Sequence, residues 1–147
     1  MEQKLKKFNE DLKKFKKFLD EKKIDFMVVG SGALLSCGIP LNRCCNDIDV
    51  EVICNEDDEK FFKLLQTSSN IKVENDYTGK TFPYVFIYQG IKINVWVVNY
   101  FSHSHYLLND FGVKIASVFS VLKRKMDYRR RKDYDDLNYI IKTFIEI

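Results

Sequence analysis

The longest apolar stretches of this chain have the length of β-strands, and this limits what it can fold into. They lie around residues 26–30 and 91–98, and neither approaches the roughly 18 consecutive apolar residues of a membrane-spanning helix. With 147 residues, of which 46% are hydrophobic, the chain can still bury a substantial core. We therefore expect one folded domain over residues 1–147, with no membrane span and no disordered tail.

Residues 1–23 have the pattern of an amphipathic helix. Apolar residues recur at steps of three and four, as the buried face of a helix requires, at Leu5, Phe8, Leu12, Phe15 and Leu19. Nine lysines and several acidic residues fill the other positions. We interpret them as a solvated face with acid–base pairs four residues apart, and not as a nucleic-acid or membrane surface. No apolar signal region accompanies the lysines, so we expect a cytoplasmic location.

The rest of the chain alternates between strand and helix patterns. Strand patterns cover 25–29, 48–54, 71–75, 83–88 and 91–98, and helical patterns cover 33–37, about 58–67, 113–128 and 132–145. A polar, aromatic loop is expected over 99–110. This order predicts an α/β (α+β) fold, in which helices pack against a mixed sheet of about five strands and the C-terminal helices lie within 112–146.

The cysteines and histidines have no spacing typical of a zinc site. The four cysteines form no CxxC pair, and neither His103 nor His105 stands at zinc-finger distance from them. We expect reduced, mostly buried thiols and two histidines on the surface. The cysteines are Cys37, Cys44, Cys45 and Cys54.

A glycine-serine turn, Gly30-Ser31, follows the first predicted strand and precedes a short helical segment. At such a junction, unpaired backbone N–H groups and the positive end of the helix dipole favour a phosphate group. Gly30 would let the backbone approach the phosphate closely, and Ser31 would offer a hydroxyl group. A turn of this kind is common in α/β proteins, so by itself it is a weak signal.

Two aspartates open the second predicted strand. Asp47 and Asp49 are two residues apart, so a strand places both carboxylates on one face of the sheet, while Val50 and Val52 point into the core. Neighbouring carboxylates repel each other, and a cation such as Mg²⁺, held by carboxylates and substrate phosphates, would offset that repulsion. The alternative is that both aspartates cap a turn; the phosphate-type turn 17 residues earlier favours the metal site.

Together these segments resemble the nucleotidyltransferase superfamily, whose members have the polymerase-beta-like fold. Gly30-Ser31 and Asp47-Ile48-Asp49-Val50 resemble its hG[GS] and Dh[DE]h motifs. Arg43 stands four residues before the first aspartate, where relatives often have arginine. Lys123 and the RKDYDDL segment at 131–137 resemble the K…[RK]-D-x-x-D-L tail of AbiEii-like proteins. The resemblance spans residues 26–140 and is greatest to the small AbiEii-like and minimal nucleotidyltransferases of bacteria.

The resemblance implies an enzyme that transfers a nucleoside monophosphate from an NTP to an acceptor with Mg²⁺ or Mn²⁺. Asp47 and Asp49 would hold the metal ions, and Lys123 would neutralise phosphate charge. The residues implied in nucleotide binding are Gly30, Ser31, Arg43, Lys132 and Asp133.

Two positions depart from the family pattern. Asn94 stands where relatives usually have a third metal-binding carboxylate. Asparagine can ligate a metal through its carbonyl oxygen, but it has no charge and cannot accept a proton as a general base. Cys45 stands where relatives favour threonine. The alternative source of a third carboxylate is Glu74 or Asp76, on the preceding strand pattern.

Seven of the ten residues from 123 to 132 are basic. Such a patch would attract an RNA acceptor, and Tyr128 and Tyr134 could stack on its bases. The alternatives are a solvated turn between two helices and a surface that binds only the triphosphate.

We therefore expect a nucleotidyltransferase-like protein that binds NTP and Mg²⁺ and transfers a nucleoside monophosphate to an unidentified acceptor, for which RNA and protein are the candidates. One alternative is a catalytically impaired nucleotide-binding module, such as one component of a toxin–antitoxin pair. Another is an enzyme that modifies an antibiotic.

Overall fold

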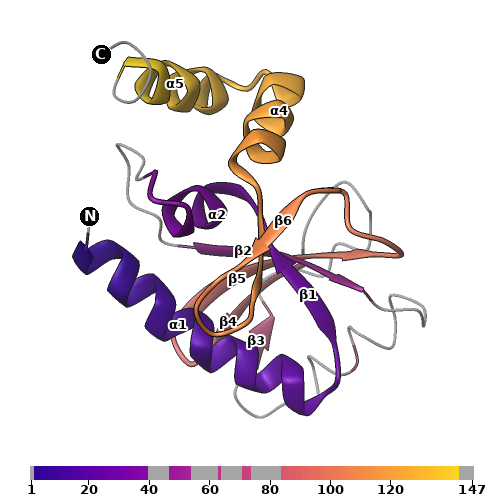
Figure 1. The fold of residues 1–147 in the computed structure, drawn as a ribbon. Coiled ribbons are helices and arrows are strands. Elements are labelled where there is room, and N and C mark those ends of the chain that lie inside the picture. The colour runs from indigo at the N-terminus through magenta and orange to yellow at the C-terminus, as the bar shows by residue number, and fades with distance from the viewer. Residues whose placement is uncertain (1, 40–46, 54–62, 64–70, 74–83, 143–147) are drawn as a thin grey trace.

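The computed structural model describes residues 2–39, 47–53, 63, 71–73 and 84–142 (Figure 1). Its strands are β1 (Asp25–Val28), β2 (Asp47–Ile53), β3 (Ile71–Val73), β4 (Tyr84–Tyr88), β5 (Ile91–Val98), β6 (Tyr106–Leu108) and β7 (Lys114–Ala116). Its helices are α1 (Glu2–Glu21), α2 (Gly30–Ser36), α4 (Val118–Tyr128) and α5 (Arg131–Ile140).

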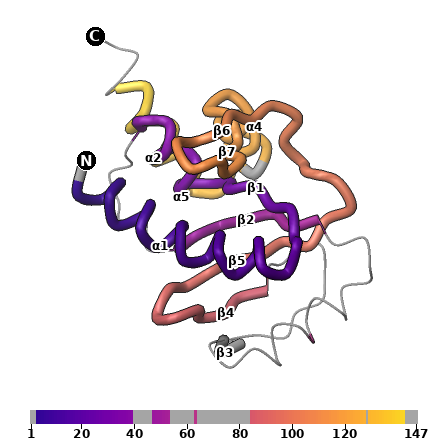
Figure 2. Tube along the Cα trace, turned by 60° about the horizontal axis from the view of Figure 1, so that its bottom comes forward, coloured from indigo at the N-terminus to yellow at the C-terminus, as the bar shows by residue number. Residues whose placement is uncertain are grey.

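All seven strands form one mixed sheet in the order β3-β4-β5-β2-β1-β7-β6, which can be followed in Figure 2. β2 is parallel to β5 and β1 is parallel to β7, whereas the other neighbours are antiparallel. A mixed sheet with helices confirms the predicted fold class, and the described residues contain seven strands where about five were expected.

Helix α1 lies across one face of this sheet. The ring of Phe15 packs against Phe26 of β1 and against Phe86 and Tyr88 of β4, with ring centroids 5.9 to 6.3 Å apart. Four of the five predicted apolar positions of the helix are buried, and Leu5 packs partly buried against the core. Ion pairs join its lysines to aspartates four residues later, Lys7 to Asp11 and Lys16 to Asp20, which confirms the interpretation of a solvated face.

The two faces of the sheet differ in chemistry. Along β2, Ile48, Val50 and Val52 are buried in the core under α1. The alternate residues Asp47, Asp49 and Glu51 therefore lie on the opposite face. The period of two predicted this arrangement for both aspartates.

Helix α2 packs closely on α1, since a Cβ atom on Gly32 would lie 2.5 Å from the ring of Phe8. Helix α4 contacts both α2 and α5. Within the described ranges, no helix has both the length and the apolar character needed to cross a bilayer.

Two predictions about the segment from 99 to 128 are wrong. The expected loop over 99–110 contains β6, and the helix expected from residue 113 starts only at Val118, because Lys114–Ala116 form β7. β7 pairs in parallel with Met27 and Val28 of β1. Ser117 then caps α4 by accepting a hydrogen bond from the Ser120 N–H at 3.2 Å.

Candidate functional site

The turn from β1 into α2 requires glycine. Gly30 has a φ of +66°, in the left-handed region, where a residue with a Cβ atom is strained. The N–H of the preceding Val29 donates a hydrogen bond to the Asp49 carbonyl oxygen at 2.9 Å. A Cβ atom at Gly30 would lie only 2.8 Å from Asp49 Oδ2. The predicted phosphate turn therefore lies directly against the predicted carboxylate strand.

Asn94 lies between the two aspartates of β2. The parallel register of β2 and β5 places Asp49 opposite Asn94 and Asp47 opposite Lys92. The side-chain amide Nδ2 of Asn94 donates to Asp49 Oδ1 at 2.8 Å and to Asp47 Oδ2 at 3.3 Å. The Lys92 ammonium lies 3.7 Å from Asp47 Oδ2. The structure thus brings together Gly30, Asp47, Asp49 and Asn94.

The carboxyl group of Asp49 is in an electrostatically costly position. Burial raises the pKa of Asp49. The hydrogen bond from Asn94 opposes this rise, the negative charge of Asp47 adds to it, and the charges of Lys132 and Lys125 also oppose it. A buried carboxylate beside a second one gains from a nearby cation.

The donor atoms at this site fit a hard cation such as Mg²⁺, because they are carboxylate oxygens. In the part of the chain that the structure describes, no three His, Cys, Asp or Glu side chains gather as a metal site. Further ligands would therefore be water, a substrate phosphate, or the Asn94 carbonyl oxygen after rotation of its amide.

A buried charge network joins α4 to α5. The Lys125 ammonium lies 2.8 Å from Asp136 Oδ2 and 3.7 Å from Asp133 Oδ1. Arg130 donates to the same Asp133 through Nε at 2.7 Å and Nη2 at 3.2 Å. Asp133 therefore holds Arg130 and Lys125 in place at the end of the molecule where Asp49 lies.

Lys123, the lysine that the resemblance assigned to the site, is exposed on α4, whereas Lys125 is buried. Lys125 follows the buried Val121 by four residues, so both belong to the inner face of the helix. The helical period could have identified Lys125 in the sequence. Lys132 is exposed on α5, and its charge acts on Asp49.

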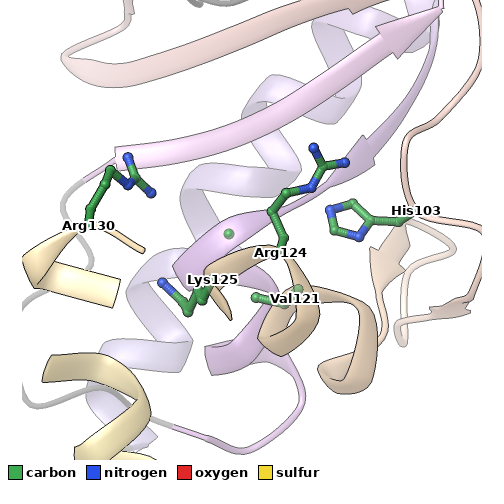
Figure 3. Close-up of a pocket in the computed structure, with 6 residues that line it drawn as sticks. His103, Val121, Arg124, Lys125 and Arg130 are labelled. Atoms are coloured by element: carbon green, nitrogen blue, oxygen red, sulfur yellow. The ribbon is translucent and has the colours of Figure 1, made fainter. Parts of the chain in front are cut away.

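A small pocket has Gly30 in its lining, and Figure 3 shows the side chains around it. Arg130 and Lys125 lie at one end of it, and Arg124 and His103 at the other. Its lining residues are Gly30, His103, Val121, Arg124, Lys125 and Arg130. His103 is only 7% exposed, so the prediction of a surface histidine is wrong there; it is confirmed for His105.

The basic run from 123 to 132 spans the end of α4, a short turn and the start of α5. Arg129 ends α4 in the left-handed conformation, with φ of +53°, and Arg130 precedes the first turn of α5. Arg129 and Arg131 are exposed. The turn is thus solvated on one side and lines the pocket, through Arg130, on the other.

Some predicted residues lie outside the described ranges: Arg43, Cys44, Cys45, Cys54, Glu74, Asp76 and, apart from Lys63, the helix expected over 58–67. Ser31 is half-buried beside Gly30. Cys37 is a half-buried free thiol, and burial raises the pKa of that thiol.

Several solved structures resemble this chain, and two of them are nucleotidyltransferase-type proteins. An antigenic nucleotidyltransferase-like protein from Paracoccidioides brasiliensis matches with a TM-score of 0.53 and 20% identity, over 85% of this chain and 69% of that one. ANT(2″)-Ia, solved in complex with adenylyl-2″-tobramycin, matches with a TM-score of 0.54 and 10% identity, over 85% and 82%. No protein-family model and no curated protein matches the sequence. The AbiEii-like subtype thus stays a prediction, and what these likenesses establish is the fold of nucleotidyltransferase-like proteins.

Proposed function

We propose that this protein binds a nucleoside triphosphate beside the Gly30 turn and, with Mg²⁺ or Mn²⁺, transfers its nucleoside monophosphate to an acceptor hydroxyl group. The new bond joins that oxygen to the α-phosphorus, the bond from the α-phosphorus to the β-phosphate oxygen breaks, and pyrophosphate leaves. The observation that carries this proposal is the 2.8 Å approach of Asp49 Oδ2 to the Cβ position of Gly30. It puts a carboxylate pair, suited to a cation, next to a turn that a phosphate can approach. The likeness to nucleotidyltransferase-like folds supports the same proposal.

Asp47 and Asp49 would hold the metal ion. When bound, the ion would neutralise triphosphate charge and help to activate the acceptor hydroxyl group. The site it would occupy is shielded on one side by β5, whose Asn94 already contacts both carboxylates.

The chain's own cations would orient the triphosphate. Lys125, Arg124 and Arg130 line the pocket beside Gly30, and preorganised cations of this kind stabilise the charge that develops on transferring phosphoryl groups. Asp133 and Asp136 act as positioning residues, because they fix Lys125 and Arg130 through the network between α4 and α5.

The exposed side of the basic run supports RNA as an acceptor class. A small polar molecule is the other class to test, because ANT(2″)-Ia was solved with adenylyl-2″-tobramycin.

A second candidate function is nucleotide binding without transfer, and Asn94 is the observation that favours it. Its amide nitrogen donates to both carboxylates, and an amide cannot accept the proton of an attacking hydroxyl group. Such a module would regulate a partner protein through its nucleotide-bound state.

The test is incubation with α-labelled NTPs, Mg²⁺ and separate pools of RNA, protein and aminoglycosides. We expect label on one pool, with loss of at least about 100-fold in Asp47→Asn if the metal site carries the reaction. Asp25→Asn is the matched control, because Asp25 lies on β1, the strand next to β2, and forms an exposed ion pair with Lys114 of β7. Incorporation that survives Asp47→Asn contradicts the proposal. Binding of MgATP without incorporation, together with a gain of transfer in Asn94→Asp, supports the second candidate.

A further inference from the structure

Glu51 fixes the segment that follows β5 against the sheet. Glu51 is 8% exposed on the same face of β2 as Asp49. Its Oε1 accepts a hydrogen bond from the Ser102 backbone N–H at 2.9 Å, and its Oε2 accepts one from the Ser102 hydroxyl at 2.5 Å. The next residue, His103, is thereby held in the wall of the pocket.

His103 shares this wall with three permanent cations. Arg124 and Lys125 come from α4, and Arg130 from the turn before α5. Acidic side chains offset part of this charge: Asp133 and Asp136 contact Lys125.

Burial lowers the pKa of His103, and the charge of Arg124 lowers it further, while Glu51 opposes both. The neutral form of the ring therefore predominates at pH 7 in the free protein. A polyanion in the pocket would reverse this balance, because opposite charge nearby favours the charged form.

We propose that His103 takes up a proton when the polyphosphate of a nucleotide, or pyrophosphate, enters this pocket, and that it thereby becomes the fourth cation of the anion site. The inference rests on the proposed function, because it names the group that couples nucleotide binding at this site to pH. Glu51 is the positioning residue, since it holds Ser102 and with it the ring of His103.

This coupling has a definite sign. Anion binding raises the pKa of His103 from its depressed value in the free protein. Between the pKa of His103 in the free protein and its pKa in the anion complex, the affinity for the anion should fall as pH rises, by up to about tenfold per pH unit. At pH values below the pKa of His103 in the free protein, the ring is charged both without and with the anion. The ring then no longer contributes to the pH dependence of the affinity.

The test uses inorganic pyrophosphate in EDTA, so that no divalent cation takes part. Calorimetric titrations at pH 7 in buffers of different ionisation enthalpy count the protons taken up on binding. Wild type should take up more protons than His103→Gln, by up to about one per site, because the ionisation of pyrophosphate itself is the same in both. His105→Gln is the matched control: it removes the exposed histidine two residues away and should behave like wild type.

A second measurement needs no variant at position 103. The chain has only two histidines, so the ring signals in NMR spectra of His105→Gln belong to His103 alone. Adding pyrophosphate should shift the titration midpoint of that ring to higher pH.

The outcomes separate this inference from the proposed function. Equal proton uptake in wild type and His103→Gln, or an unmoved His103 midpoint, overturns the inference. So does failure of pyrophosphate to bind, even if MgATP binds, its label reaches an acceptor and Asp47→Asn abolishes that transfer, in which case the proposed function stands. If neither ligand binds, both are overturned.

Discussion

Replacing Gly30 with alanine tests the contact between the turn and the carboxylate strand. The substitution forces a residue with a Cβ atom into a φ of +66°, which costs about 1 kcal/mol. The new methyl group also meets Asp49 Oδ2 at 2.8 Å, and Asp49 cannot withdraw freely because Asn94 holds its other oxygen. Overpacking of this kind adds roughly 2 kcal/mol. We therefore expect Gly30→Ala to lower the free energy of unfolding by about 3 kcal/mol.

Gly38→Ala is the matched control for the backbone part of this cost. Gly38 also has positive φ, +85°, but nothing lies within 4 Å of its Cβ position, so it should lose only about 1 kcal/mol. Urea unfolding followed by circular dichroism measures both variants. In thermal scans, the difference of about 2 kcal/mol corresponds to roughly 6 °C in Tm for a chain of this size.

The double variant Gly30→Ala with Asp49→Ala isolates the steric contact. In the Asp49→Ala background the carboxylate oxygen is absent. There, alanine at position 30 should lower the free energy of unfolding by little more than Gly38→Ala does. Equal losses in Gly30→Ala and Gly38→Ala would refute the reasoning, because they would mean that Asp49 does not lie against the turn.

Two more predictions concern the network between α4 and α5. Lys125→Met leaves the buried carboxylates of Asp133 and Asp136 without their lysine and should lower the free energy of unfolding in urea by about 3 kcal/mol. Lys123→Met, at an exposed position, should change this free energy by less than about 0.5 kcal/mol. A larger loss in Lys123→Met than in Lys125→Met would contradict the network. Burial alone would raise the pKa of Asp133, but the hydrogen bonds and charge of Arg130 outweigh it and hold this pKa below its ordinary value. Its contribution to stability should therefore be complete above about pH 4 and be lost as pH falls through the depressed value. The gap in unfolding free energy between wild type and Asp133→Asn should narrow in acid; a gap that stays constant from neutral pH into acid would contradict the role of Arg130.

The fold was predictable where local patterns agree with the final structure. The steps of three and four from Leu5 to Leu19 gave α1, and the apolar runs at 26–29 and 91–98 gave β1 and β5. β7 could not be predicted, because three residues show no alternation and their strand state comes from pairing with Met27 and Val28, far away in the sequence. β6 then forms by pairing with β7.

The candidate site also contains residues that the sequence could predict and residues that it could not. The spacing of Asp47 and Asp49 predicts a shared face, and the parallel register of β2 and β5 places Asn94 where the family pattern predicted it. His103 was missed because its burial depends on Glu51, a residue 52 positions earlier whose carboxylate binds the neighbouring Ser102. No local signal contains such a long-range contact.

Paramagnetic broadening by Mn²⁺ in the presence of ATP locates the bound metal. We expect the amide signals of Gly30, Asp49 and Asn94 to broaden first, and Asp47→Asn to abolish this broadening at the same Mn²⁺ concentration. Broadening that centres on other carboxylates, or that persists unchanged in Asp47→Asn, would contradict a cation site formed by the carboxylate pair beside the Gly30 turn.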